Sequence, residues 1–252
     1  IPVIDAKNNI TRVECKDLEI GDKIPVQKNK GLFGDRDMEK EAYLLGLYQS
    51  DGTQNKSSVM LDLWENDFDL VDIVETYLHD LYEKYSYKPR YKNKGGYFVD
   101  GHPTQNGVEK KRLTTTLLKN IGFSKGTIPQ WMWVSNEKTQ WAYVKGLLQT
   151  DGTVYKGESE GNPVQLSYSD INKDFLKELQ LLFSNLGINT AIHLGRKEGV
   201  YQLPDGKGGY KDYECKAVYK LVVGSKTSLL TIEKNTNFLT RKGVVIEDKV
   251  YR

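Results

Sequence analysis

The chain has 252 residues, of which 38% are hydrophobic, and this is enough to bury the core of one large domain or of two ordinary ones. Its 36 basic and 34 acidic side chains leave a net charge of +2, so overall charge indicates no particular partner. The sequence has neither an apolar run of about 18 residues nor a secretion signal, so we expect no membrane segment and an intracellular location, in the cytoplasm or nucleoid. Two cysteines are too few for a disulfide scaffold or a structural zinc site.

The first segment in chain order, residues 1–37, contains the stretch VECKDLEIGDKIPV, in which apolar residues alternate with polar ones around a Gly-Asp pair. Alternation with a period of two is typical of a strand, and a Gly-Asp pair is typical of a turn. We therefore predict a short N-terminal β extension ahead of the main fold.

Two comparable halves follow, and we place them at residues 38–132 and 133–252. Each half begins with a helix that ends in Asp-Gly and continues through strand-like residues into an amphipathic helix. Further strands and a short helix then lead to a Lys-Gly pair. The order αββαββα thus occurs twice, at a spacing too long for a solenoid repeat, which indicates duplication of a domain. We predict an α+β fold of two pseudo-symmetric subdomains joined by the polar connector 123–136.

The clearest repeat is the pair of stretches YLLGLYQSDGT and YVKGLLQTDGT, which begin at Tyr43 and Tyr143. Small residues four apart share one face of each predicted helix, and small side chains let two helix backbones approach closely. An interior glycine costs about 1 kcal/mol relative to alanine, so two matching glycines indicate a compensating contact. We predict that the helices pack against each other through Ala42, Gly46 and Ser50 and through Ala142, Gly146 and Thr150.

Parallel packing would bring together the two helix C-termini, where Asp51 and Asp151 are each followed by a glycine. Neighbouring carboxylates repel each other, and the negative ends of the helix dipoles add to the repulsion, so the site must hold a proton or recruit cations. Mg²⁺ suits such a site, because it binds one or two carboxylates and keeps positions for water and phosphate oxygens. A single copy of this motif is more often only a helix that ends in a turn, but the second copy favours a metal site that could cleave a phosphodiester.

These residues resemble the single-chain, two-motif LAGLIDADG homing endonucleases of the intein-associated type. LLGLYQSDG and VKGLLQTDG share the family's glycine, the following leucine and the terminal Asp-Gly, while Gln49 and Gln149 replace the first aspartate of the family name. The resemblance covers about residues 38–245 and implies a DNA-binding saddle of two sheets that reads the major groove of double-stranded DNA. It also implies a monomer with an internal pseudo-two-fold axis that cuts both strands across the minor groove and leaves 3′ overhangs.

The resemblance further implies roles for particular residues. The family places a lysine after the last helix of each half, and here Lys125 and Lys242 would orient the attacking water and stabilise phosphate charge. Either lysine alone could be a solvated loop residue, but their matched placement favours a catalytic role. The implied site for Mg²⁺, or for Mn²⁺ in its place, consists of Asp51, Asp151 and the backbone carbonyls of Ser50 and Thr150.

Basic residues at every second position follow the acidic helix of the first half, and a strand would send all of them to one face. Such a face could bind a polyanion, although basic residues are also common on strands that only face solvent. Phosphate contacts dominate the affinity of proteins for DNA. The candidate DNA contacts in the two halves are Lys88, Arg90, Lys92, Lys94, Lys110, Arg112, Lys156, Arg196, Lys197 and Lys220.

The N-terminal stretch VECKDLEIGDKIPV resembles the Asp-Leu-x-x-Gly-Asp segment of intein splicing domains. We expect a site-specific, Mg²⁺-dependent DNA endonuclease, a phosphodiester hydrolase, that derives from an intein and has no splicing activity of its own, because Ile1 and Arg252 are not the residues that splicing requires. The alternative is a catalytically inactive protein of the same fold, acting as a transcription regulator or an RNA-splicing maturase. A protein-interaction domain would be a third reading. The three histidines lie on separate elements, which disfavours a histidine-based nuclease.

Overall fold

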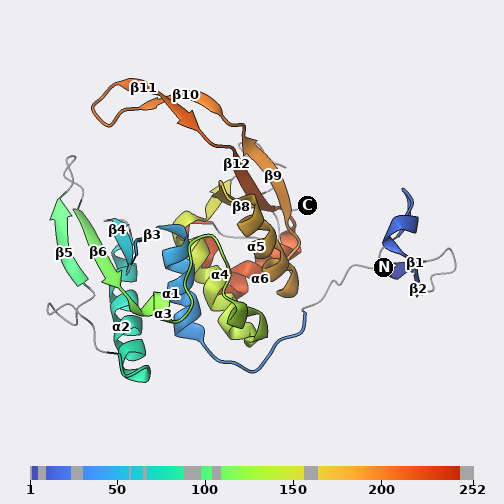
Figure 1. Cartoon of the computed structure of the whole chain (residues 1–252), viewed down its shortest axis with the longest axis horizontal. Coiled ribbons are helices and arrows are strands. Elements are labelled where there is room, and N and C mark those ends of the chain that lie inside the picture. The colour runs from blue at the N-terminus through green and yellow to red at the C-terminus, as the bar shows by residue number, and fades with distance from the viewer. Residues whose placement is uncertain are drawn as a thin grey trace.

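The computed structural model describes residues 2–4, 10–23, 31–56, 58–64, 67–87, 98–103, 109–155 and 164–244. Two central helices lie side by side, with a four-stranded antiparallel sheet on either side of them (Figure 1). The predicted α+β fold of two αββαββα units is confirmed, while the boundaries at residues 38 and 133 stay a prediction. In the part of the chain that the structure describes, no helix combines the length and apolar character that crossing a membrane requires.

The first unit buries one face of its sheet under a helix. In β4, Val59, Leu61 and Leu63 are buried and alternate with more exposed residues, because successive side chains of a strand point to opposite faces. Helix α2 packs on the buried face, where the hydroxyl of Tyr82 donates to Oγ1 of Thr115 at 3.0 Å. The sheet has the strand order β3-β4-β6-β5. The elements of this unit are α1 (Glu39–Ser50), β3 (Gly52–Gln54), β4 (Val59–Trp64), α2 (Asp69–Lys84), β5 (Phe98–Pro103), β6 (Glu109–Thr115) and α3 (Leu117–Asn120).

The second unit repeats this plan, with the strand order β7-β8-β12-β9. Its amphipathic helix begins after Asn172, whose side-chain oxygen accepts hydrogen bonds from the backbone of Asp174 and Phe175, and it stops before Gly187, as the sequence predicts. The connector before this unit contains a short 3₁₀ helix, η3 (Gln130–Val134). The elements of the unit are α4 (Glu137–Asp151), β7 (Thr153–Tyr155), β8 (Gln165–Asp170), α5 (Lys173–Asn185), β9 (Ala191–Arg196), β12 (Val218–Val223), α6 (Lys226–Thr236) and α7 (Phe238–Arg241).

A hairpin that the predicted element order does not contain interrupts the second unit between β9 and β12. It consists of β10 (Gly199–Pro204) and β11 (Tyr210–Cys215), pairs with neither four-stranded sheet, and arches beyond the second sheet (Figure 1). Its turn is closed by the carboxylate of Asp205, which accepts from the N–H groups of Lys207 and Gly209. The signal was present in the sequence, because YQLPDGKGGYKDY sets an Asp-Gly turn between two segments that could pair.

The N-terminal segment contains two antiparallel strands, β1 (Pro2–Ile4) and β2 (Ile10–Arg12), and a 3₁₀ helix, η1 (Cys15–Asp17). The alternating stretch that begins at Val13 was expected to be a strand, but it forms no strand between residues 13 and 22. Local hydrogen bonds replace strand pairing there, since the N–H of Asp17 donates to the carbonyl of Glu14 at 3.0 Å. The side chain of Ile20 in this stretch is fully exposed.

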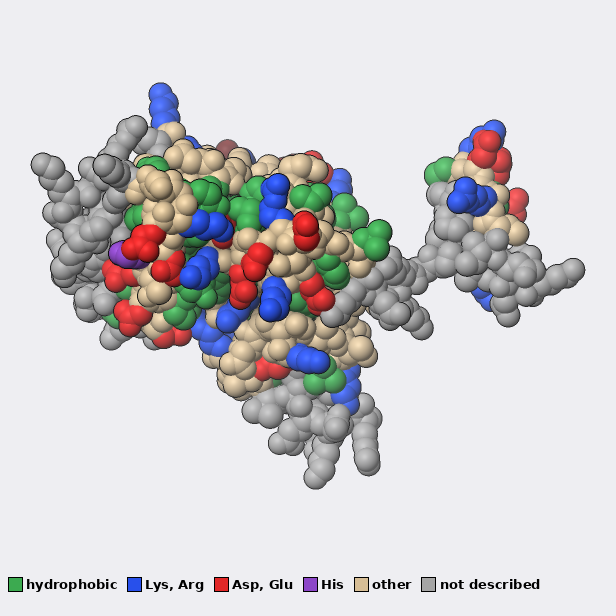
Figure 2. Space-filling model, turned by 90° about the horizontal axis from the view of Figure 1, so that it is seen from below, with side chains coloured by type: hydrophobic (Ala, Val, Ile, Leu, Met, Phe, Trp, Pro, Cys, Tyr) green, Lys and Arg blue, Asp and Glu red, His purple; other side chains and the backbone are tan. Residues whose placement is uncertain are grey.

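The charged side chains on the face seen from below are of both signs. Figure 2 shows Lys and Arg side chains interspersed with Asp and Glu side chains, without a continuous basic patch among the described residues on that face. Ion pairs are also formed elsewhere in the described part of the chain, by Lys40 with Asp80 at 2.6 Å and by Lys84 with the buried Glu41 at 2.6 Å. This face is therefore poorly suited to a polyanion.

Candidate active site

The two central helices touch at their matching glycines, as the repeated sequence predicts. A Cβ atom on Gly46 would lie 2.2 Å from the carbonyl oxygen of Tyr143, and one on Gly146 would lie 2.2 Å from the carbonyl oxygen of Tyr43. Any larger side chain at either position would push the helix backbones apart. One turn further on, the hydroxyls of Ser50 and Thr150 hydrogen-bond to each other. The C-terminal ends of α1 and α4 therefore converge.

Two carboxylates meet where the helices end. Asp51 caps α1 and Asp151 is the last residue of α4, and their side chains lie within hydrogen-bonding reach of each other. The chain then turns sharply into β3 and β7, and a Cβ atom on Gly52 would lie only 2.1 Å from the carbonyl oxygen of Tyr48. The Asp-Gly pair thus places a carboxylate at the helix end and lets the backbone fold back against the last turn.

The two carboxylates disfavour each other's ionisation. Loss of surrounding water at the helix junction, followed by repulsion from Asp151, raises the pKa of Asp51 to about 6. The pKa of Asp151 is also raised, mainly by the same loss of water, although Lys125 and Lys242 oppose the rise. Both residues remain open to solvent, so a cation could reach them. Asp51 therefore holds a proton only below about pH 6, and at neutral pH a cation would relieve the repulsion between the two carboxylates.

The oxygen donors at this junction fit a hard divalent cation. The described residues contain no group of three or more His, Cys, Asp or Glu side chains that could hold a metal. Two carboxylates are nevertheless enough for Mg²⁺, which leaves its other positions to water and phosphate oxygens. The carbonyl of Ser50, a predicted ligand, accepts a hydrogen bond from Lys125, and the hydroxyl of Thr150 faces that of Ser50.

Lys125 is docked on the end of the first helix. Its ammonium nitrogen donates to the carbonyl oxygen of Ser50 at 2.6 Å and to that of Gly52 at 2.9 Å. Burial lowers the pKa of Lys125, while the attraction of Asp151, Asp170 and Asp51 opposes the change. The lysine of the first half is thus fixed beside Asp51 before any substrate is bound.

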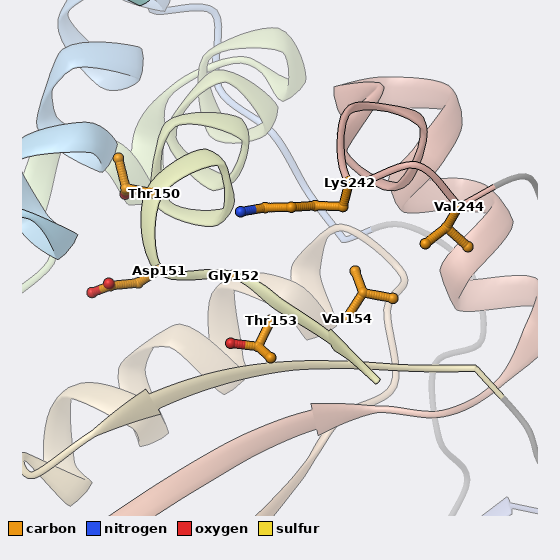
Figure 3. A pocket seen from close by; sticks show the side chains of 7 residues that line it. All are labelled: Thr150, Asp151, Gly152, Thr153, Val154, Lys242 and Val244. Atoms are coloured by element: carbon orange, nitrogen blue, oxygen red, sulfur yellow. The ribbon is translucent and has the colours of Figure 1, made fainter. Parts of the chain in front are cut away.

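Lys242 occupies the matching place in the second half, with different contacts. It lines a cavity of about 570 Å³ together with Asp151, and its side chain points toward the end of α4 (Figure 3). The ammonium group lies 5.8 Å from the centre of the Phe238 ring and has no hydrogen-bond partner among the described residues. The remaining residues that line the cavity are Thr150, Gly152, Thr153, Val154 and Val244.

The predicted DNA contacts are only partly placed by the structure. In β6, Arg112 lies opposite Asp62 and binds it through two hydrogen bonds of 2.7 and 2.8 Å, so an acid on the same face already neutralises its charge. Lys110 lies opposite Trp64 in register. Lys88, Arg90, Lys92, Lys94 and Lys156 lie outside the described residues.

In the second half, the basic candidates lie on or beside the sheet. Lys220 is exposed on β12 and pairs with Ser169 and His193 in register. Arg196 lies over the ring of Tyr201 at 5.1 Å, and Lys197 is exposed at the base of the hairpin. On the opposite face of β8 and β12, four residues are buried: Leu166, Tyr168, Leu221 and Val223.

Polar residues that the basic pattern did not predict share the open face of the second sheet with Lys220. Directly paired residues of antiparallel strands lie on the same face. This rule groups Thr153 with Ser167 and Tyr155 with Gln165, next to Ser169 and His193. The alternation of NPVQLSYS, with apolar residues at every second position, was the signal that could have found Gln165, Ser167 and Ser169.

Among known proteins, this chain matches one protein family and is similar to a reductase and a helicase. Residues 138–235 match the family described as LAGLIDADG-like domain. The chain is 30% identical over 227 residues to the ribonucleoside-diphosphate reductase NrdEB subunit alpha of Bacillus subtilis, covering 87% of this chain and 21% of that protein. It is 28% identical over 167 residues to the ATP-dependent DNA helicase Hel308 of Thermococcus kodakarensis, covering 63% of this chain and 14% of the helicase. The chain thus spans about a fifth or less of these curated relatives.

Among solved structures, the homing endonuclease I-DmoI in complex with DNA and Mn is similar to this chain. The identity is 18%, the match covers 79% of this chain and 96% of the other, and the TM-score is 0.47.

Proposed function

Because this chain is a member of the LAGLIDADG family, we propose that it is a site-specific homing endonuclease that makes a metal-dependent double-strand break in a long DNA target. The observation that carries the proposal is the junction of α1 and α4, where Asp51 and Asp151 face each other with a lysine from each half nearby. A helix junction that only stabilised the fold would gain nothing from two acids that repel each other at solvent.

An origin in an intein is supported by the names of the relatives. A reductase and a helicase catalyse unrelated reactions, yet both match this chain over segments that are a small part of their own length. An insert that moves between genes accounts for such a pattern, whereas a shared catalytic domain does not. We therefore attribute neither reductase nor helicase activity to this chain.

The chemistry follows from the residues at the junction. A divalent cation such as Mg²⁺ bound by Asp51 and Asp151 would supply Lewis acidity toward a phosphodiester and lower the pKa of a bound water. Lys125 and Lys242 place positive charge where the phosphate would gain negative charge. The open sheet faces, with Lys220 in the second half, are the surfaces that we assign to double-stranded DNA.

A randomised duplex library tests the proposal, because it lets the protein select its own target sequence. The protein is incubated with the library and Mg²⁺, and the ends released by cutting are captured by ligation and sequenced. We expect a single long consensus with 3′ overhangs. Asp51→Asn and Asp151→Asn should each reduce double-strand cutting at least ~100-fold while still enriching the same duplexes.

The matched control is Asp72→Asn, which changes an exposed carboxylate on α2 and should cut like the wild type. A protein that enriches duplexes but releases no ends would be an inactive DNA-binding relative instead. Wild-type cutting by Asp51→Asn would refute the role given to the carboxylates.

A further inference from the structure

We propose that each of the two lysine loops is held in its working position by the opposite half of the molecule. The inference rests on the proposed function, since it concerns how Lys125 and Lys242 are aligned for cutting. The loops are residues 124–128, which contain Lys125, and residues 241–244, which contain Lys242. The first loop follows α3, the last helix of its half, and the second begins with Arg241, the last residue of α7.

The first loop is bound to α5 of the second half. The side-chain nitrogen of Asn172 donates to the carbonyl oxygen of Gly126 at 3.3 Å. Further along the loop, the N–H of Ile128 donates to a carboxylate oxygen of Glu178 at 2.9 Å. Gly126 directly follows Lys125, so the contact with Asn172 fixes the backbone next to the lysine.

The second loop is bound to the start of α2 in the first half. Arg241 directly precedes Lys242, and its guanidinium donates to the carboxylates of Asp67 at 2.7 Å and Asp69 at 3.2 Å. The same guanidinium donates to the backbone carbonyl of Gln149 at 2.9 Å, in the last turn of α4. The Arg241 side chain is only 18% exposed, so this ion pair is better shielded from solvent than an ordinary surface pair.

The two anchors are related by the internal repeat, because each joins a lysine loop to the N-terminal end of the other unit's amphipathic helix. The two loops differ in the support that each receives from its own half. The side chain of Gln49 gives the first loop a second support, from its own half. The amide nitrogen of Gln49 donates to the carbonyl of Ser124, and its amide oxygen accepts from the N–H of Gly126. The corresponding Gln149 side chain instead accepts from the hydroxyl of Tyr43 at 2.5 Å. The second loop lacks this support from a glutamine side chain, and its own half supports it through the bond from Arg241 to the carbonyl of Gln149.

A lysine reaches its target through a long, flexible side chain, so the position of its backbone decides where the ammonium can go. A displacement of about 1 Å can cost about 100-fold in rate. Anchoring each loop on the opposite half would make each centre competent only when the two halves are correctly assembled. Arg241 and Asn172 are thus positioning residues for two different centres.

The test measures cutting of each strand separately, on a duplex recovered from the library and labelled differently on its two strands. Arg241→Met should slow the cutting of one strand about 10- to 100-fold and leave the other strand nearly unchanged. Arg241→Lys, which keeps the charge but cannot make all three contacts, should fall between Arg241→Met and the wild type. Asn172→Asp keeps the oxygen that caps α5 and removes the donor to Gly126, and it should slow the opposite strand by a smaller factor.

The control is Lys40→Met, which removes an ion pair of 2.6 Å between α1 and α2 of the same half and should leave both strands unaffected. A loss of stability alone would slow both strands together. Equal slowing of the two strands by Arg241→Met, or no slowing, would overturn the inference.

A second measurement needs no DNA. In the wild type, the backbone N–H groups of Lys242, Gly243 and Val244 donate to carbonyls of α7. Replacing both Asp67 and Asp69 by alanine should increase amide hydrogen exchange in the segment 238–244, although both substitutions lie in the other half. Unchanged exchange would overturn the anchor. A wild-type protein that cuts no duplex would refute the proposed function, and the exchange experiment would still decide whether the anchor exists.

Discussion

The two halves of the molecule are alike where their helices cross and different where their lysines lie. At the crossing, a Cβ atom added to Gly46 or to Gly146 would lie the same 2.2 Å from a carbonyl oxygen of the opposite helix. Beyond the helix ends, Lys125 is hydrogen-bonded to two carbonyls, whereas the described residues offer no such partner to Lys242. A duplicated sequence thus reproduces backbone geometry more faithfully than side-chain contacts, and the surroundings of the two lysines are not equivalent.

The halves also differ in the length of one connection between neighbouring strands of the sheet. In the first half, β5 and β6 are separated by residues 104–108, whereas in the second half the hairpin β10–β11 lies between β9 and β12. The hairpin adds an extension that the first half lacks (Figure 1). Insertions of this kind are tolerated at strand connections because they leave the packed core unchanged.

Adding a single carbon atom to either central glycine tests whether the two helices contribute equally to the crossing. Gly46→Ala and Gly146→Ala should each lower the free energy of unfolding by about 3 kcal/mol, because the new methyl group would collide with a backbone carbonyl. Urea unfolding followed by circular dichroism measures the change. Gly224→Ala is the matched control, since nothing lies within 4 Å of its added Cβ. Unequal losses for the two central glycines would contradict the symmetry of the crossing.

Because Lys125 and Lys242 differ in their contacts, replacing them should change stability by unequal amounts but slow cutting by similar factors. Lys125→Met leaves two carbonyl oxygens without their donor and should cost about 1 kcal/mol of stability, whereas Lys242→Met should change stability by less than about 0.5 kcal/mol. Each variant should slow cutting about 100-fold. Urea unfolding and the strand-resolved assay measure the two effects. If Lys242→Met lost more stability than Lys125→Met, the difference in contacts assigned to the two lysines would be wrong.

Each half contributes one of the two carboxylates, Asp51 and Asp151. A bound metal ion should therefore stabilise the folded protein through the two side chains equally. At a Mg²⁺ concentration about ten times its Kd, the folded protein should gain about 1.4 kcal/mol. Asp51→Asn and Asp151→Asn should each lose most of this gain, which thermal unfolding with Mg²⁺ and with a chelator can measure. A gain that survives in either variant would place the cation elsewhere.

The raised pKa of Asp51 predicts a pH dependence of the metal-free protein. The folded pKa of about 6 exceeds the ordinary value of 3.8, so Asp51 stabilises the fold at low pH and this contribution is lost as pH rises through 6. Asp51→Asn should therefore be more stable than the wild type at about pH 8, by on the order of 1 kcal/mol because solvent screens the pair, and the advantage should shrink toward about pH 4. If Asp51→Asn were less stable than the wild type at about pH 8, the proposed repulsion between Asp51 and Asp151 would be excluded.

The sequence was most informative where local pattern and packing agree. The amphipathic helix from Lys173 to Asn185 could be predicted from its apolar stripe and from the stop at Gly187, and the structure confirms it. The alternation that began at Val13 was misleading, because a strand needs a partner and a layer to cover it, and neither is specified by the alternation itself.

By itself, the sequence determined that two helices with small residues on one face would meet and bring Asp51 and Asp151 together. Spacing along a helix fixes which residues share a face, and only small residues allow two backbones to touch. Only the tertiary structure decided that Arg241 would reach Asp67, that Asn172 would reach Gly126, and that Lys125 and Lys242 would differ in their contacts. Such contacts depend on where distant segments lie after packing, and no local spacing encodes that position.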